Sequence, residues 1–131
     1  MMDNHRIQLI STVITRLPLK PSHICLFKAF YEVANNWISI SELAYRIQDD
    51  ESSMSGILGS LGNRINQTEG IERPYDGYGL LMAWETYHDE LHYRGLPELR
   101  TVIERFPVLQ NTLNLSVDEI HRLHKDGLAI F

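Results

Sequence analysis

The sequence predicts a mostly helical domain that carries one small β-hairpin. Apolar residues recur at every third or fourth position in several segments, which is the period of an α-helix with one buried face. Between residues 78 and 96, by contrast, two β-prone runs flank a short polar turn. The length of 131 residues suits one domain and is too short for two complete cores.

The beginning of the chain predicts two helices and a short strand. Apolar residues at helical spacing mark a helix over residues 4–17, and the prolines that follow end it. A second helix is expected to begin near Pro21 or Ser22, because proline is tolerated in a first turn. Apolar residues between 24 and 37 cover more than one stripe, which is typical of a buried central helix. Residues 37–40 are β-prone and predict a short strand.

Serines mark the starts of the next two helices. Ser41 is expected to cap a short helix over residues 42–47. Ser52 or Ser53 is expected to cap a longer helix that runs to about Asn66. The apolar residues of the longer helix fall within one arc of a helical wheel: Met54, Ile57, Leu58, Leu61 and Ile65. That arc is expected to face the core, which leaves polar residues and glycines on the outer face.

The hairpin follows a connecting loop over residues 68–77. Residues 78–87 are expected to form a strand, residues 88–90 a turn and residues 91–96 the return strand. Five aromatic residues gather around it: Tyr75, Tyr78, Trp84, Tyr87 and Tyr93. Such side chains can stack on bases or line a ligand pocket. In a small hairpin they more often pack across the strands, and we expect that packing here.

Two helices are expected after the hairpin. Pro97 begins the first of them and Pro107 closes it. The second follows a capping box, in which Ser116 is the cap and Glu119 stands three residues later. This last helix is short and is expected to end near Gly127.

The chain divides into three parts on this basis. Residues 1–20 form an N-terminal helix that is expected to dimerise, and residues 21–96 form the core. Residues 97–131 form C-terminal helices that pack on the core or on a dimer partner. Two apolar faces exceed what one small core needs, and they are Ile7-Ile10-Ile14 and Leu99-Ile103-Phe106. A two-fold axis would bury such faces, so a homodimer is expected.

Composition and charge exclude several classes. The single cysteine, Cys25, excludes an internal disulfide and a cysteine-built zinc site, and a reducing cytoplasm is the expected location. No apolar run is long enough to span a bilayer. The net charge is −5, and the whole excess of acid lies after Asn66. Tight non-specific binding to nucleic acid needs a basic patch, so the overall charge argues against it without excluding a local face.

The order of elements resembles the winged helix-turn-helix family of small prokaryotic DNA-binding proteins. The resemblance covers Ser22 to about Arg94, and it is carried by the helix around Phe27, the strand Trp37–Ile40, Ser41-Glu-Leu-Ala44, the helix Ser53–Asn66, and the hairpin around Trp84 and His92. It implies that the helix over residues 53–66 enters the major groove, that the hairpin wing touches the flanking backbone, and that the added helices build a dimer. Two features depart from the pattern: this helix has one basic residue, Arg64, and acidic Asp89 and Glu90 lie at the hairpin tip.

The candidate DNA contacts lie mainly outside the apolar arc of that helix. Serine, asparagine and glutamine can hydrogen-bond to phosphates and base edges, and arginines can contact phosphates. The candidate residues are Ser52, Ser53, Ser55, Ser60, Asn63, Arg64, Gln67, Arg73 and Arg94. The alternative is a face that is merely solvated. Gly56, Gly59 and Gly62 recur along the same helix, and they predict either the close approach of a phosphate, a groove wall or another helix, or a poor helix that tertiary packing supports.

Other residue clusters carry weaker signals. His88, Glu90 and His92 alternate along the hairpin, and His121 and His124 are three residues apart, but each group lacks ligands at workable spacing for a metal. Cys25 is interpreted as an inert small hydrophobic residue. We therefore expect no metal, no cofactor and no catalytic residue.

Sequence-specific binding to double-stranded DNA, by a small homodimeric transcriptional regulator, is the expected function. The alternative is a winged helix module that does not bind DNA and binds a protein partner through the acidic second half. An enzyme or ligand sensor is the least expected class, because no catalytic motif is present.

Overall fold

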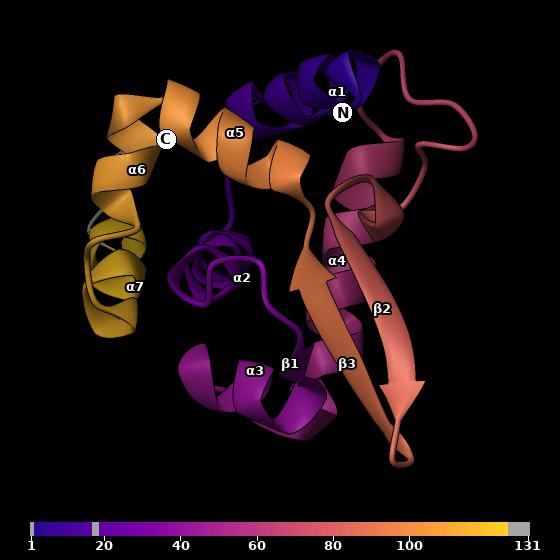
Figure 1. Ribbon diagram of the computed structural model, residues 1–131. Helices are drawn as coiled ribbons and strands as arrows, with labels where there is room; N and C mark the ends of the chain where they lie inside the picture. Colours follow the sequence, from indigo (N-terminus) through magenta and orange to yellow (C-terminus); the bar gives the residue numbers. More distant parts are fainter. Residues whose placement is uncertain (1, 17–18, 126–131) are drawn as a thin grey trace.

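The computed structural model describes residues 2–16 and 19–125, and these residues form seven α-helices and a three-stranded antiparallel sheet (Figure 1). The first half contains α1 (Asn4–Thr15), α2 (Pro21–Glu32), β1 (Ile38–Ser39), α3 (Ile40–Arg46) and α4 (Met54–Asn66). The second half contains β2 (Met82–Tyr87), β3 (Glu90–Gly95), α5 (Pro97–Arg105), α6 (Pro107–Thr112) and α7 (Val117–Lys125). The mostly helical class with one hairpin is thereby confirmed. Within the described ranges, no helix is long and apolar enough to cross a membrane.

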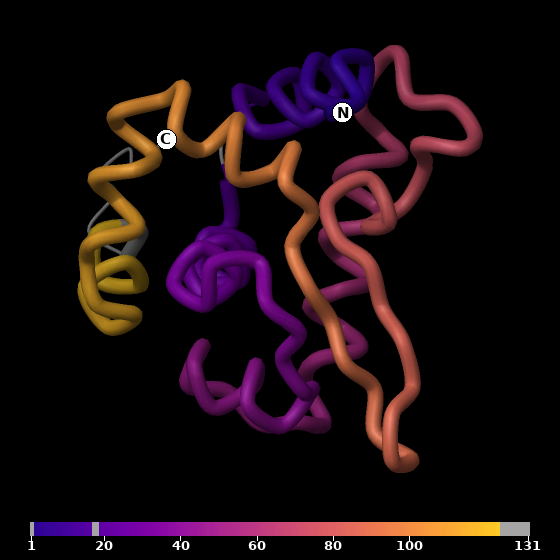
Figure 2. The backbone as a smooth tube through the Cα atoms, viewed as in Figure 1, coloured from indigo at the N-terminus to yellow at the C-terminus, as the bar shows by residue number. Residues whose placement is uncertain are grey.

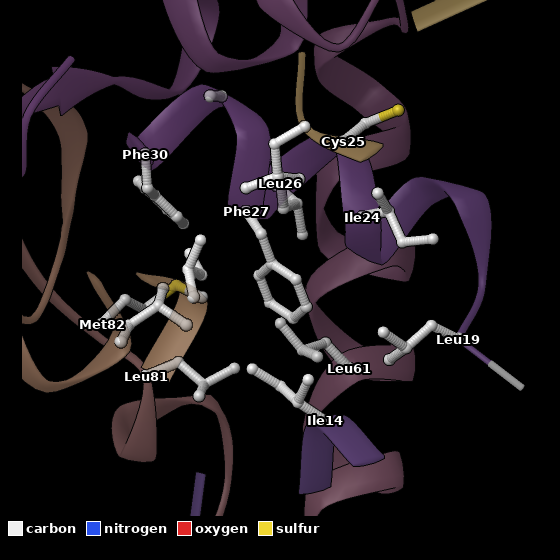
Figure 3. Packing of buried hydrophobic residues seen from close by; sticks show 14 of the residues in the cluster. Ile14, Leu19, Ile24, Cys25, Leu26, Phe27, Phe30, Leu61, Leu81 and Met82 are labelled. Atoms are coloured by element: carbon white, nitrogen blue, oxygen red, sulfur yellow. The ribbon is translucent and has the colours of Figure 1, made fainter. Parts of the chain in front are cut away.

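Helix α2 lies at the centre of the core, as its apolar pattern predicts. Its side chains Phe27 and Phe30 are fully buried. Figure 3 shows Phe27 pointing toward Leu61 of α4 and Ile14 of α1. The helix ends at Glu32 and does not continue to residue 37. The backbone reverses there because Ala34 and Asn35 adopt left-handed conformations, with φ of 53° and 63°.

The sheet has the strand order β1-β3-β2. A two-residue turn, His88-Asp89, joins β2 to β3, and both residues have positive φ (50° and 61°), as the tight turns of hairpins require. The predicted turn at residues 88–90 is therefore one residue too long, since Glu90 already belongs to β3. The strand predicted from residue 78 begins only at Met82. Residues 78–80 form a 3-10 turn instead, which buries Leu80.

The predicted helix caps are partly wrong. Ser39, not Ser41, caps α3, because its hydroxyl accepts a hydrogen bond from the backbone N–H of Glu42 at 3.2 Å. The Ser41 hydroxyl donates instead to Glu90 Oε2 at 2.8 Å, which ties α3 to the hairpin. Ser53 precedes α4 but makes no capping hydrogen bond, because a 3-10 turn over Glu51–Ser53 leads into the helix.

The C-terminal region contains a helix that the sequence analysis missed. Helix α5 ends before Pro107, as predicted, and Pro107 also begins α6. The extended backbone of Phe106 separates the two helices. The capping box is confirmed: Glu119 N–H donates to Ser116 Oγ at 3.1 Å, and Ser116 N–H donates to Glu119 Oε1 at 3.2 Å. The predicted end near Gly127 lies outside the described residues.

The apolar faces that suggested a dimer pack against each other within one chain. Figures 1 and 2 show α1 lying beside α5, and the two helices are in contact. Ile10 and Ile14 of α1 and Ile103 of α5 are at most 1% exposed. The Asp3 N–H also donates to Glu98 Oε2 at 3.1 Å, which joins the same two segments. The idea that these faces exceed the needs of one core was therefore wrong, and the homodimer stays a prediction without that support.

Candidate functional site

Helix α4 presents a polar outer face. Its predicted core arc is confirmed, with Met54, Leu58, Leu61 and Ile65 buried, although Ile57 is only half-buried. On the opposite side, the polar side chains of Ser52, Ser55, Asn63 and Gln67 are exposed, and Ser53 and Ser60 are half-exposed. Asn66 is exposed too, but its side chain accepts a hydrogen bond from Gly77 N–H at 2.6 Å and so serves the following loop.

The three glycines of α4 do not share one environment. Gly62 is buried, and a Cβ there would lie 3.8 Å from Tyr78. The expectation that all three lie on the outer face was therefore wrong for Gly62. A Cβ at Gly56 or Gly59 would meet nothing within 4 Å. Packing within the chain does not require a glycine at either position, and the open space above them stays accessible.

A groove of about 570 Å³ runs along this outer face, between α4 and residues at the end of α1 and the start of α2. Its lining residues are Arg16, Lys20, His23, Gly56, Gly59, Ser60, Asn63, Arg64 and Gln67. Three of them are cations, and none of the described lining residues carries a negative charge. The groove is therefore a local basic site in a chain whose net charge is −5.

Neutral oxygens hold the cations in place. Lys20 Nζ donates to Ser60 Oγ at 2.8 Å. Arg16 donates to the Arg64 carbonyl at 3.0 Å and to Thr68 Oγ1 at 3.1 Å. Arg64 itself donates to the Val13 carbonyl, with a nitrogen–oxygen distance of 3.4 Å. For Arg16 and Lys20, these bonds position the positive charge without neutralising it.

The electrostatics of Arg64 show the crowding of positive charge. Burial lowers its pKa first, and the positive charge of Arg16 lowers it further. A charge that is partly removed from water beside a like charge is costly unless an anion compensates it. The described lining of the groove holds three cations and no carboxylate, so the groove favours a negatively charged occupant.

His23 lies at the same groove and is fully buried. Among the described residues, neither ring nitrogen has a hydrogen-bond partner, which is rare for buried polar atoms and calls for an explanation. Burial, then the charges of Lys20 and Arg64, lowers the pKa of His23 to about 4. The ring is therefore neutral at pH 7, with one N–H able to donate.

The structure does not bring all predicted DNA contacts together. Ser60, Asn63, Arg64 and Gln67 line the groove, whereas Ser52, Ser53 and Ser55 lie toward the start of α4 outside its lining. Arg73 is exposed on the loop after α4. Arg94 lies on the outer face of the sheet, where its guanidinium sits 5.3 Å from the centre of the Trp37 ring.

Sequence analysis missed Arg16, Lys20 and His23. The only signal available was a row of basic or imidazole side chains around Pro21, where one helix ends and the next begins. The row itself gives no indication that it packs against α4. The structure shows this packing, since Lys20 contacts Ser60, which lies 40 positions later in the sequence.

The outer face of the sheet has the opposite character. A pocket of about 380 Å³ is lined by Trp37, Glu85, Tyr87 and His92. The ring of Tyr87 contacts that of His92, with centroids 5.8 Å apart. On the other face, Tyr93 is buried and pairs in register with Trp84, whose ring contacts that of Tyr78 with centroids 4.9 Å apart. Tyr75 instead packs on α1, where its hydroxyl donates to Asp3 at 2.9 Å.

The hairpin histidines and Cys25 lie outside the lining of the α4 groove. Among the described residues, no group of three or more histidine, cysteine, aspartate or glutamate side chains could hold a metal ion. Cys25 is buried, and burial raises the pKa of its thiol to about 11, so the thiol stays protonated. Its Sγ lies 4.0 Å from Nε2 of His121, a residue that the sequence analysis considered only as a metal ligand.

Comparisons with protein-family models, with curated proteins and with solved structures found no match to this chain.

Proposed function

We propose that this chain is a sequence-specific DNA-binding protein of the winged helix-turn-helix type and acts as a transcriptional regulator. In this proposal α2, α3 and α4 are the three helices of the motif, and the hairpin β2–β3 is its wing. The observation that carries the proposal is the basic groove along the exposed polar face of α4. A reading helix needs polar side chains for base edges and adjacent cations for phosphates, and this face offers both.

Each groove residue has a distinct role in the proposed complex. Asn63 and Gln67 are exposed and can pair with adenine edges in the major groove. Arg16, Lys20 and Arg64 contact backbone phosphates along one flank of the helix. The open space above Gly56 and Gly59 lets the duplex approach the α4 backbone closely.

Acidic residues limit where the duplex can lie. Asp49, Asp50 and Glu51 precede α4, and Asp89 and Glu90 lie at the hairpin tip. Carboxylates at both places would repel phosphates. We therefore place the contact over residues 56–67 of α4, away from its start, and assign the wing tip no phosphate contact. Arg94 lies on the outer sheet face with Trp37 and is also left out of the proposed interface.

Selection of duplexes from a random library at low salt tests this function. The proposal expects an enriched sequence and loss of the enrichment when Asn63 is replaced by alanine. Thr12→Ala, at an exposed position on α1 outside the groove, is the matched control and keeps the enrichment. A library from which the wild-type chain enriches no sequence would contradict sequence-specific binding.

A protein-interaction module is the second candidate, and the outer sheet face favours it. Trp37 and Tyr87 are 42% and 61% exposed beside Glu85, and exposed aromatic residues are common in protein interfaces. Glu85→Lys separates the two functions. It would weaken binding of a protein partner at this face, whereas it would leave the α4 groove, and with it duplex binding, unchanged.

A further inference from the structure

The groove has features of a discrete anion site as well as of a general basic surface. Its cations come from the end of α1, the start of α2 and the last turn of α4, so three elements fix one pocket. Its volume of about 570 Å³ accommodates a phosphate group together with the organic group attached to it. The described lining contains no carboxylate to compete for the cations.

His23 supplies the second, independent indication. The ring is wholly buried, yet neither nitrogen has a partner in the part of the chain that the structure describes. A buried polar group without a hydrogen bond is costly, so an acceptor for the imidazole N–H would stabilise this part of the groove. A neutral imidazole N–H at the groove would gain an acceptor from a bound oxyanion, while Lys20 and Arg16 would supply the charge.

The start of α2 adds to the same field. The helix begins at Pro21, directly after Lys20, and no side chain caps it. An uncapped helix N-terminus carries a partial positive charge and attracts anions. This contribution supports the site only together with the cations and the unpartnered imidazole.

We propose that the groove is a phosphate-binding site in its own right, with Lys20, Arg16 and Arg64 as its cations and His23 as a neutral hydrogen-bond donor. The phosphate group comes either from a nucleic-acid backbone or from a small phosphorylated molecule. The phosphate site rests on the proposed function in one respect: a bound DNA duplex would use the same site. A phosphorylated small molecule bound there would cover Asn63 and Gln67 and so compete with DNA.

The test titrates inorganic phosphate into the full chain and follows the histidine ring signals by NMR. Saturable binding that shifts the His23 signals supports the site. Lys20→Gln and Arg16→Gln each lower the affinity for phosphate by roughly tenfold, because each removes a charge-assisted contact. Both residues are exposed, so neither variant threatens the fold. Arg105→Gln removes the same charge from an exposed position on α5 outside the groove and leaves the affinity unchanged.

Three further ligands identify the source of the phosphate. A nucleoside monophosphate that binds more tightly than inorganic phosphate, while the bare nucleoside does not bind, indicates a small ligand. A duplex that displaces inorganic phosphate indicates the nucleic-acid backbone. Either result supports the site. Phosphate binding without any duplex binding keeps the site and removes the proposed DNA function.

The proposal would be overturned if millimolar phosphate left the His23 signals unmoved, or if Lys20→Gln and Arg105→Gln altered phosphate binding equally. His23→Leu provides a second check, because it removes the donor and keeps an apolar side chain of similar size. Loss of roughly tenfold in affinity, with the thermal unfolding transition retained, supports the imidazole contact. Unchanged affinity would contradict it.

Discussion

The α4 groove and the outer face of the sheet have opposite electrostatic arrangements. In the groove, Lys20 and Arg16 bond only to neutral oxygens among their described hydrogen-bond partners. In a pocket that Trp37 and His92 of the sheet face also line, the Arg46 guanidinium of α3 forms ion pairs with Glu42 at 3.1 Å and Glu32 of α2 at 3.8 Å. The net charge of −5 therefore does not describe either surface. Charges that the fold leaves uncompensated mark a binding site better than the overall balance does.

The largest expected effect concerns His23 and pH. The folded chain holds the pKa of His23 at about 4, against 6.5 for an ordinary histidine, so the unfolded chain binds the proton more readily. His23 therefore does not lower the free energy of unfolding above pH 6.5. As the pH falls from 6.5 toward 4, it lowers that free energy by up to about 3 kcal/mol. Denaturant unfolding at pH 7 and pH 4.5 measures the loss.

His23→Leu is the matched control for that prediction, because leucine does not titrate. The variant should lose less stability than the wild-type chain between the two pH values. It should be as stable as the wild-type chain at pH 7, or more stable, because two unpartnered ring nitrogens disappear. Equal pH dependence in the two chains would show that His23 is not held neutral by burial.

The next effect separates base reading from phosphate contact. Asn63→Ala should weaken binding to the selected duplex by about 1–3 kcal/mol and leave binding to a random duplex nearly unchanged. Asn63 is exposed on α4, so the fold does not depend on its side chain. Fluorescence anisotropy with both duplexes measures the two affinities. Equal losses on both would assign Asn63 to the backbone.

The smallest effect concerns the open glycines. Gly59→Ala should stabilise the chain by up to about 1 kcal/mol, because alanine favours the helix and the added Cβ meets nothing within 4 Å. The same variant should weaken duplex binding, since the Cβ occupies the space that the duplex would use. A variant that is more stable and binds DNA equally well would exclude close approach at this glycine.

Local patterns predicted some parts of the fold and not others. The core arc of α4 and the Ser116–Glu119 capping box depend on residues within one or two turns, so the sequence revealed them. The α3 cap was misplaced because Ser39 and Ser41 are equally suitable locally, and only the contact of Ser41 with Glu90 distinguishes them.

The sequence predicted only one of the two walls of the α4 groove. The polar face of α4 follows from the helical wheel, and Asn63, Arg64 and Gln67 were found in this way. The opposite wall could not be found, because Arg16, Lys20 and His23 become neighbours of α4 only through packing of distant segments. The pairing of α1 with α5 was missed for the same reason, and their apolar faces were assigned to a dimer.

The salt dependence of duplex binding tests the central claim most directly. For the wild-type chain, the account predicts an affinity that falls with salt. For the Arg16→Gln, Lys20→Gln double variant it predicts a weaker affinity and a slope smaller by about two units, one for each lost phosphate contact. Arg105→Gln, which removes a charge outside the groove, should keep the wild-type slope. Equal slopes in all three chains, or no duplex binding by the wild-type chain, would contradict the assignment of the α4 groove to DNA.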